Sequence, residues 1–75
     1  MTRQDKVRNT VRRHRLLQDI TQQELAERVG VTRQTIVSIE KGRYKPSIVL
    51  ALRLAEAFAV PVEALFQLDR GDDHG

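Results

Sequence analysis

The sequence has no cysteine and no tryptophan, and it contains one tyrosine and two phenylalanines among its 75 residues. No disulfide can therefore stabilise a chain of this size, which buries only about 60% of its unfolded surface and forms one small domain. The absence of cysteine also fits a reducing compartment. So few aromatic rings disfavour single-stranded RNA binding, because they provide no platforms on which bases could stack.

Long apolar runs and catalytic side chains are also missing. No stretch approaches the length of a transmembrane helix, and residues 1–15 are too polar for a signal peptide, so we expect a cytoplasmic protein without a membrane partner. His14 and His74 are the only histidines, so a zinc site lacks ligands. The sequence contains no nucleophile–base set, no phosphate loop and no paired carboxylates in a core context. We therefore expect no metal, no cofactor, no small-molecule ligand and no enzymatic activity.

Charge is distributed unevenly along the chain. Residues 1–45 hold eleven Lys/Arg and five Asp/Glu, for a net charge of +6, whereas residues 46–75 hold two Arg and five Asp/Glu, for a net charge of −3. The formal total is +3, and the isoelectric point lies near 10.0. A basic front and an acidic back favour a nucleic-acid partner, although scattered surface charge gives a similar count.

Two short helices joined by a glycine turn form the clearest pattern in the middle of the chain. Thr21 and Glu24 match a capping box, and Gly30 follows the apolar stripe at a point where a positive φ ends a helix. Thr32 caps the next helix, whose apolar residues share one side. This spacing predicts a helix-turn-helix, a motif that presents its second helix to the major groove of DNA.

Three further helices complete an all-α domain of five helices. The first runs from an N-cap at Asn9 to residue 17 or 18, and Gly42 ends the helix that follows the turn. Ser47 caps a fourth helix that continues to Phe58, and Pro61 begins a fifth that ends near residue 65. The fourth helix has apolar residues spaced for burial at Ile48, Ala51, Leu52, Ala55 and Phe58.

The pattern divides the chain into three segments. Residues 1–8 form an N-terminal arm or short strand, and residues 9–66 form the helix-turn-helix domain. Residues 67–75 complete a short strand and continue as a disordered acidic tail, which begins at Asp69 and includes Asp72, Asp73 and His74.

The polar side of the predicted recognition helix carries candidate base contacts. Arginine can bond guanine O6 and N7, glutamine can bond adenine N6 and N7, and valine can contact a thymine methyl; each good bidentate pair discriminates by about 1–3 kcal/mol. A solvated polar face, which is common on surface helices, fits the same pattern. The predicted base contacts are Arg33, Gln34, Val37 and Ser38.

Candidate phosphate contacts flank this helix. Gln22 lies in the first turn of the preceding helix, where free backbone N–H groups favour phosphate, although simple surface polarity explains it equally. After the recognition helix, three cations and a tyrosine fall within five residues. They would bind the sugar-phosphate backbone of DNA without distinguishing its sequence. The predicted backbone contacts are Thr21, Gln22, Thr32, Thr35, Lys41, Arg43, Tyr44 and Lys45.

Glu40 lies beside the inward-facing Ile36 and Ile39, and a carboxylate on an apolar side needs a cation. Arg15, on the inward side of the first helix, is the candidate partner, and the pair would tie the first helix to the third. Two separately solvated charges fit the sequence equally.

Taken in order, these elements resemble the Xre family, the helix-turn-helix regulators typified by phage repressors and Cro. The resemblance lies in TQQELA at residues 21–26, GVTRQTI at 30–36 and IEKGRYKPS at 39–47, and it continues through LA at 50–51 and VEALF at 62–66. It implies a five-helix domain whose third helix reads DNA, with phosphate contact at Gln22 and base contact at Arg33, Gln34 and Ser38. It also implies that Arg15 and Glu40 form a buried ion pair.

The resemblance further implies a homodimer, and some family members of this type add a small intermolecular or terminal β-pairing. Residues 6–8 and 66–68 are candidates for two paired strands. The residues assigned to an apolar dimer interface are Val62, Leu65, Phe66 and Leu68. We expect a repressor that acts on an inverted-repeat operator by occlusion. The alternative is an antitoxin or adaptor module that binds a foreign chain through the apolar surface of the fifth helix, at Val62, Leu65 and Phe66.

Overall fold

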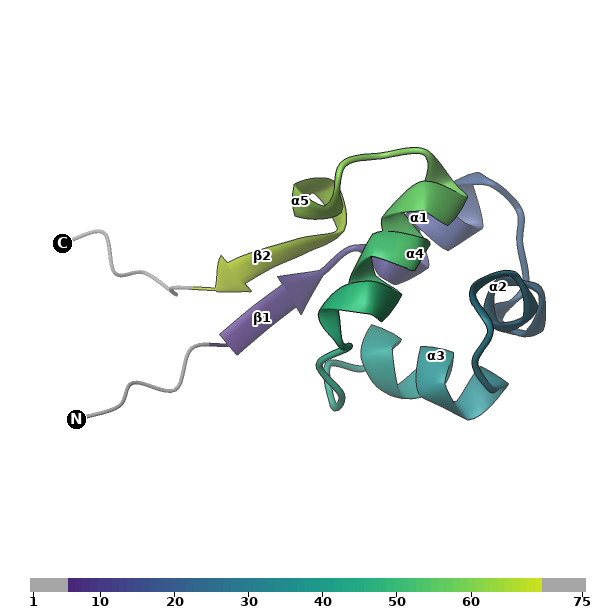
Figure 1. Cartoon of the computed structure of the whole chain (residues 1–75), viewed down its shortest axis with the longest axis horizontal. Coiled ribbons are helices and arrows are strands. Elements are labelled where there is room, and N and C mark those ends of the chain that lie inside the picture. Colours follow the sequence, from purple (N-terminus) through teal and green to yellow (C-terminus); the bar gives the residue numbers. More distant parts are fainter. Residues whose placement is uncertain (1–5, 70–75) are drawn as a thin grey trace, which may run out of the picture.

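The computed structural model describes residues 6–69, which form five helices and one two-stranded antiparallel sheet (Figure 1). In chain order the elements are β1 (Lys6–Asn9), α1 (Val11–Leu17), α2 (Gln22–Val29), α3 (Arg33–Glu40), α4 (Ile48–Phe58), α5 (Val62–Leu65) and β2 (Phe66–Asp69). The helices form the body, and the strands form a ribbon that projects from it (Figure 1). The predicted five-helix architecture with a terminal β-pairing is confirmed. No helix within residues 6–69 is long and apolar enough to cross a membrane.

A single apolar core holds the helices together, and every helix contributes to it. Burying one large apolar side chain completely contributes about 1.5–3 kcal/mol, so a few leucines and isoleucines account for much of the packing between helices. The buried apolar residues are Val11, Ile20, Leu25, Ala26, Val29, Ile36, Ile39, Leu50, Leu54, Ala55, Phe58 and Leu65.

Both ends of α2 have the predicted chemistry. The N–H of Thr21 donates to the Glu24 carboxylate at 2.8 Å, and the N–H of Glu24 donates to the Thr21 hydroxyl oxygen at 3.0 Å, which completes the capping box. Gly30 has a φ of 77°, and the N–H of Val31 donates to the carbonyl of Ala26 at 3.0 Å. These bonds satisfy backbone groups at both ends of α2 and fix the turn into α3.

The start of α1 differs from the prediction. Thr10, not Asn9, occupies the N-cap, and Asn9 is the last residue of β1. The Thr10 hydroxyl donates to the carbonyl of Ala64 at 2.7 Å, and the Thr10 N–H donates to the carbonyl of Leu65 at 2.9 Å. These contacts with the other end of the domain decide where the helix begins. The Asn9 side-chain oxygen still accepts a bond from the N–H of Val11 at 3.2 Å.

The buried face of α4 also differs from the prediction. The helix has the predicted bounds, and the Ser47 hydroxyl oxygen accepts a bond from the N–H of Leu50 at 3.1 Å. However, Ile48 is 75% exposed and Leu52 is 53% exposed, so neither belongs to the core. Apolar residues surround most of this helix, and their spacing alone therefore does not identify the core face. The residues that face the core are Leu50, Leu54, Ala55 and Phe58.

In the ribbon, β1 and β2 pair antiparallel, with Lys6 opposite Asp69 and Asn9 opposite Phe66. Each strand contains the three predicted residues and one more. The predicted boundaries after residues 8 and 66 therefore fall inside strands, and Asp69 belongs to β2 rather than to a tail. The other named tail residues, Asp72, Asp73 and His74, lie outside the described residues.

Candidate nucleic-acid interface

The third helix turns a polar side away from the core. Ile36 and Ile39 have no exposed surface, so they fix how α3 is rotated about its own axis. Arg33 and Gln34, which occupy the first turn, are both exposed. The two longest predicted base-reading side chains therefore project from the N-terminal end of a helix whose other side is locked in the core.

The remaining polar residues of α3 lie closer to the body. Val37 and Ser38 are half-buried, so they can meet only a group that approaches the helix closely. At the start of the helix, the hydroxyl oxygens of Thr32 and Thr35 lie 3.2 Å apart. Thr32 occupies the N-cap as predicted, but its side chain makes no cap bond because its hydroxyl pairs with that of Thr35.

The basic loop predicted to bind the DNA backbone follows α3 directly. Gly42 has a φ of 75°, and the N–H of Arg43 donates to the carbonyl of Ser38 at 2.9 Å, so the chain reverses as soon as the helix ends. This turn brings three cations and a tyrosine to the end of α3 opposite to Arg33. The exposed loop side chains are Lys41, Arg43, Tyr44 and Lys45.

A buried hydrogen-bonded network ties α3 to α1 and α2. Arg15 donates from Nε to Oε2 of Glu40 at 2.7 Å and from Nη2 to Oε1 at 3.2 Å. The two side chains are only 10% and 4% exposed, so the predicted ion pair is present and lies inside the fold. Arg15 also donates from Nη1 to the carbonyl of Ile20 at 2.9 Å, and Nε2 of Gln22 donates to Oε1 of Glu40 at 3.1 Å.

Two bonds in this region were missed by sequence reasoning. Gln22 was assigned only to a phosphate, yet its amide also donates to Glu40, whose carboxylate has lone pairs to spare after binding one arginine. Nδ2 of Asn9 donates to the carbonyl of Ile39 at 2.9 Å. The sequence indicates this second bond only in a general way: the last carbonyls of any helix need a donor, but no pattern identifies Asn9 as that donor. Both bonds connect the end of α3 to segments far away in the sequence.

The residues assigned to a dimer interface are not equally accessible. Leu65 is fully buried and completes the core, so the prediction that it contacts a second chain is wrong. It points inward because α5 packs on the body with Leu65 as its fully buried residue. Val62 and Phe66 are partly buried against the core, whereas Leu68 is 47% exposed. The apolar surface at this end of the molecule therefore lies along β2.

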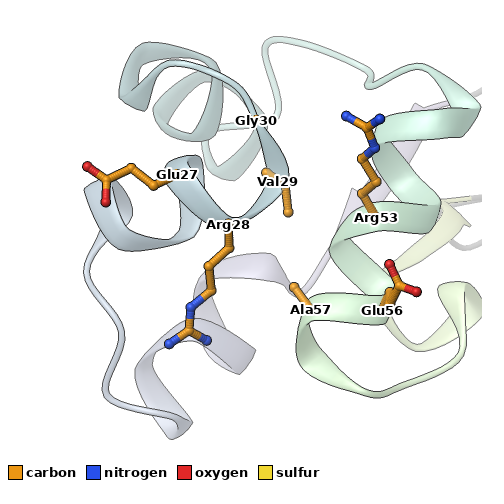
Figure 2. Close-up of a pocket in the computed structure, with 7 residues that line it drawn as sticks. All are labelled: Glu27, Arg28, Val29, Gly30, Arg53, Glu56 and Ala57. Atoms are coloured by element: carbon orange, nitrogen blue, oxygen red, sulfur yellow. The ribbon is translucent and has the colours of Figure 1, made fainter.

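A groove with a volume of about 370 Å³ lies between α2 and α4 (Figure 2). Its charged residues are two arginines and two glutamates, so it offers no net charge to DNA, and none of its residues is a predicted DNA contact. Figure 2 shows that Glu27 points away from the groove. The lining residues are Glu27, Arg28, Val29, Gly30, Arg53, Glu56 and Ala57. Residues 6–69 contain no cluster of three side chains suited to a metal ion.

A family described as helix-turn-helix matches residues 11–65, which is more than half of the chain. This chain belongs to the Xre-like helix-turn-helix family. An HTH-type transcriptional regulator of Methanothermobacter thermautotrophicus is 55% identical over 64 residues, which cover 84% of this chain and 93% of the relative. The HTH-type transcriptional regulator YgzD of Bacillus subtilis is 44% identical over 63 residues, which cover 84% of this chain and 96% of YgzD.

Solved structures of Xre-like regulators have the same fold. The restriction-modification controller protein C.AhdI from Aeromonas hydrophila superposes with a TM-score of 0.68 at 28% identity, over 72% of this chain and 82% of C.AhdI. The clp gene regulator ClgR from Corynebacterium glutamicum has the same TM-score and identity, over 71% of this chain, which spans 56% of ClgR. As a member of this family, the chain is a DNA-binding transcriptional regulator.

Proposed function

We propose that this regulator is a homodimeric repressor that binds an inverted-repeat operator in double-stranded DNA. Each protomer inserts α3 into the major groove of one half-site, and the half-sites lie about one helical turn, or roughly 34 Å, apart. The observation that carries the proposal is the orientation of α3: Ile36 and Ile39 are fully buried, and Arg33 and Gln34 are exposed in its first turn.

In this proposal, the first turn of α3 reads most of the sequence. Arg33 donates two bonds to O6 and N7 of a guanine, and Gln34 forms a bidentate pair with an adenine. Val37 contacts a thymine methyl and Ser38 a neighbouring base edge, but only where the half-buried part of α3 comes close to the groove floor. The position of α3 is held by the bonds from Arg15 and Gln22 to Glu40.

Phosphates on either side of the groove set the register. Gln22 uses one amide N–H for Glu40, which leaves its second N–H to donate to a phosphate next to the start of α2. The hydroxyls of Thr32 and Thr35 lie at the start of α3, whereas Thr21 precedes Gln22, whose bond to Glu40 places it near the end of α3. At that same end of α3, the exposed loop of Lys41, Arg43, Tyr44 and Lys45 contacts the phosphate backbone.

Repression follows from occupancy, since a bound dimer blocks any promoter that its operator overlaps. In vitro transcription from such a promoter should fall as the protein is added. A rise in transcript would mean that the regulator is an activator, and an unchanged level with the operator fully bound would refute repression by occlusion.

Fluorescence titrations with an operator selected from random DNA test the assignment of contacts. Arg33→Ala should weaken operator binding by about 1–3 kcal/mol and relax specificity at one base pair of each half-site. Lys45→Ala should weaken binding to all sequences alike and reduce the salt dependence by about one unit of slope. Arg28→Ala is the matched control, because this exposed arginine lines the α2–α4 groove.

The readers are wrongly assigned if Arg33→Ala lowers affinity for every duplex equally, or if Arg28→Ala has the same effect. The alternative function, an antitoxin or adaptor module, predicts a stoichiometric protein partner and no salt-sensitive DNA affinity. With Leu65 buried, only Val62 and Phe66 remain of the surface that this alternative requires, and both are partly covered by their own core.

A further inference from the structure

The ribbon has one apolar face and one charged face. Side chains of directly opposed residues share a face, and successive pairs alternate. The apolar face therefore holds the pairs Val7–Leu68 and Asn9–Phe66, and the charged face holds Lys6–Asp69 and Arg8–Gln67. Phe66 packs against the core and Asn9 bonds the end of α3, so this half of the ribbon is anchored. Leu68, further along, is 47% exposed.

Two strands alone are marginally stable in water, and an open strand edge invites pairing. Within residues 6–69 the sheet has only these two strands, and they project from the helical body (Figure 1). Within residues 6–69 the ribbon therefore has an open edge at which a further strand can pair.

The backbone bonds show which groups of β2 point outward. The N–H of Thr10 donates to the carbonyl of Leu65 at 2.9 Å, which continues the ladder between the strands. Because hydrogen-bonded and non-hydrogen-bonded pairs alternate, Gln67 and Asp69 point their backbone groups at β1, and Phe66 and Leu68 point theirs outward. The N–H of Phe66 is already bonded to the carbonyl of Val62. Phe66 therefore has one outward group already used by α5. Leu68 is the next residue of β2 with outward groups, and both its N–H and its C=O lie past the end of α5.

Building on the homodimer proposed above, we propose that β2 pairs antiparallel with β2 of a second copy, with the twofold axis at Leu68. The two copies of Leu68 exchange their outward backbone bonds, and the strands form a four-stranded sheet in the order β1-β2-β2-β1. The register places Gln67 opposite the partner's Asp69. It also brings the exposed leucines together beside Val7 on one apolar face.

Charge argues against pairing through the other edge. On β1 the outward backbone groups belong to Val7 and Asn9, by the same alternation. An axis at Val7 would place Lys6 opposite the partner's Arg8, and an axis at Arg8 would place two arginines opposite each other. Like charges in opposed positions destabilise a sheet. On β2 the proposed register instead places a neutral amide opposite a carboxylate.

Disulfide trapping tests this pairing directly, because the chain contains no cysteine. The Cα atoms of a hydrogen-bonded pair lie about 5.5 Å apart, a separation that a disulfide spans. Oxidised Leu68→Cys should therefore run as a covalent dimer on a non-reducing gel, with and without operator DNA. Val7→Cys is the matched control: it lies directly opposite Leu68 on the same face of the ribbon, and it should remain monomeric.

Other results would overturn the proposal. Cross-linking of Val7→Cys alone would assign the interface to β1, and equal cross-linking of both variants would mean that two ribbons pack face to face. If neither variant cross-links while light scattering gives a dimer mass, the β2 pairing is wrong and the homodimer stands. A monomer mass with and without operator would refute the homodimer itself.

A charge substitution gives a second measurement. Leu68→Lys places two cations against each other at the proposed axis and should convert the dimer to monomer in light scattering. Leu17→Lys changes another exposed leucine, 74% accessible on α1, and should leave the dimer intact. If both variants keep the dimer mass, Leu68 is not at the interface.

Discussion

Replacing Glu40 with alanine tests the network that holds the recognition helix. The substitution removes two bonds from Arg15 and one from Gln22. The guanidinium of Arg15, whose side chain is 10% exposed, then keeps only the carbonyl of Ile20 as a partner. An unpaired charge would remain inside the fold, next to a cavity where the carboxylate had been.

The expected loss of folding stability in Glu40→Ala is large for a domain of this size. Removing one partner of a buried ion pair costs about 3–5 kcal/mol. A chain of 75 residues has a total free energy of unfolding of about 4–11 kcal/mol. Glu40→Ala should therefore lower Tm by at least about 12 °C. Urea and thermal unfolding, followed by the circular dichroism of the helices, measure both quantities.

Two controls separate the ion pair from a general effect of losing a carboxylate. Glu27→Ala makes the same change at an exposed position of α2, where the only bond lost comes from Gln23 at 3.0 Å, and it should change stability by less than about 0.5 kcal/mol. The double variant Arg15→Met with Glu40→Leu removes both charges and should recover most of the loss. If Glu40→Ala loses no more stability than Glu27→Ala, the buried ion pair does not stabilise the fold.

Further predictions concern backbone conformation and pH. Gly30→Ala should destabilise the fold by about 1–2 kcal/mol in urea titrations. The cause is the φ of 77° alone, because the nearest atom to an added Cβ is 3.5 Å away. Gly30→Asn should lose less stability than Gly30→Ala, and equal losses of stability would contradict this cause. Ala59→Gly should stabilise the fold by up to about 1 kcal/mol, because Ala59 ends α4 at a φ of 58°. Glu56→Gly, inside α4, should instead destabilise the fold by about 1 kcal/mol. Bonds from the backbone and side chain of Thr21 lower the pKa of Glu24 below its ordinary 4.5. The ionised Glu24 side chain therefore contributes to folding stability above pH 4.5, and this contribution is lost as pH falls through the lowered pKa. Unfolding titrations of Glu24→Gln should lack that part of the acid dependence, and an unchanged profile would assign it to other carboxylates.

Local chemistry explains what could be predicted from the sequence. The bounds of α2 follow from bonds within a few residues, such as the capping box of Thr21 and Glu24 and the positive φ of Gly30. The exposed side of α3 follows from the spacing of Ile36 and Ile39. These signals need no knowledge of the rest of the chain, and they locate the candidate DNA contacts.

Contacts between distant segments explain what could not. Asn9 looks like a cap in the sequence, but Thr10 takes that position because it bonds a carbonyl 54 residues away. Leu65 reads as a surface residue until the packing of α5 on the core is known. The sequence indicates only the phosphate role of Gln22 and not its bond to Glu40, because that bond joins two helices whose relative placement no short pattern specifies.

Selection of bound fragments from random duplex DNA, carried out in parallel with the unaltered protein and with Arg33→Ala, tests most directly whether the exposed end of α3 reads sequence. The account predicts a palindromic consensus for the unaltered protein and, for the variant, the same consensus with preference lost at one symmetry-related position in each half. An identical consensus for both proteins, or no enriched sequence for either, would contradict it.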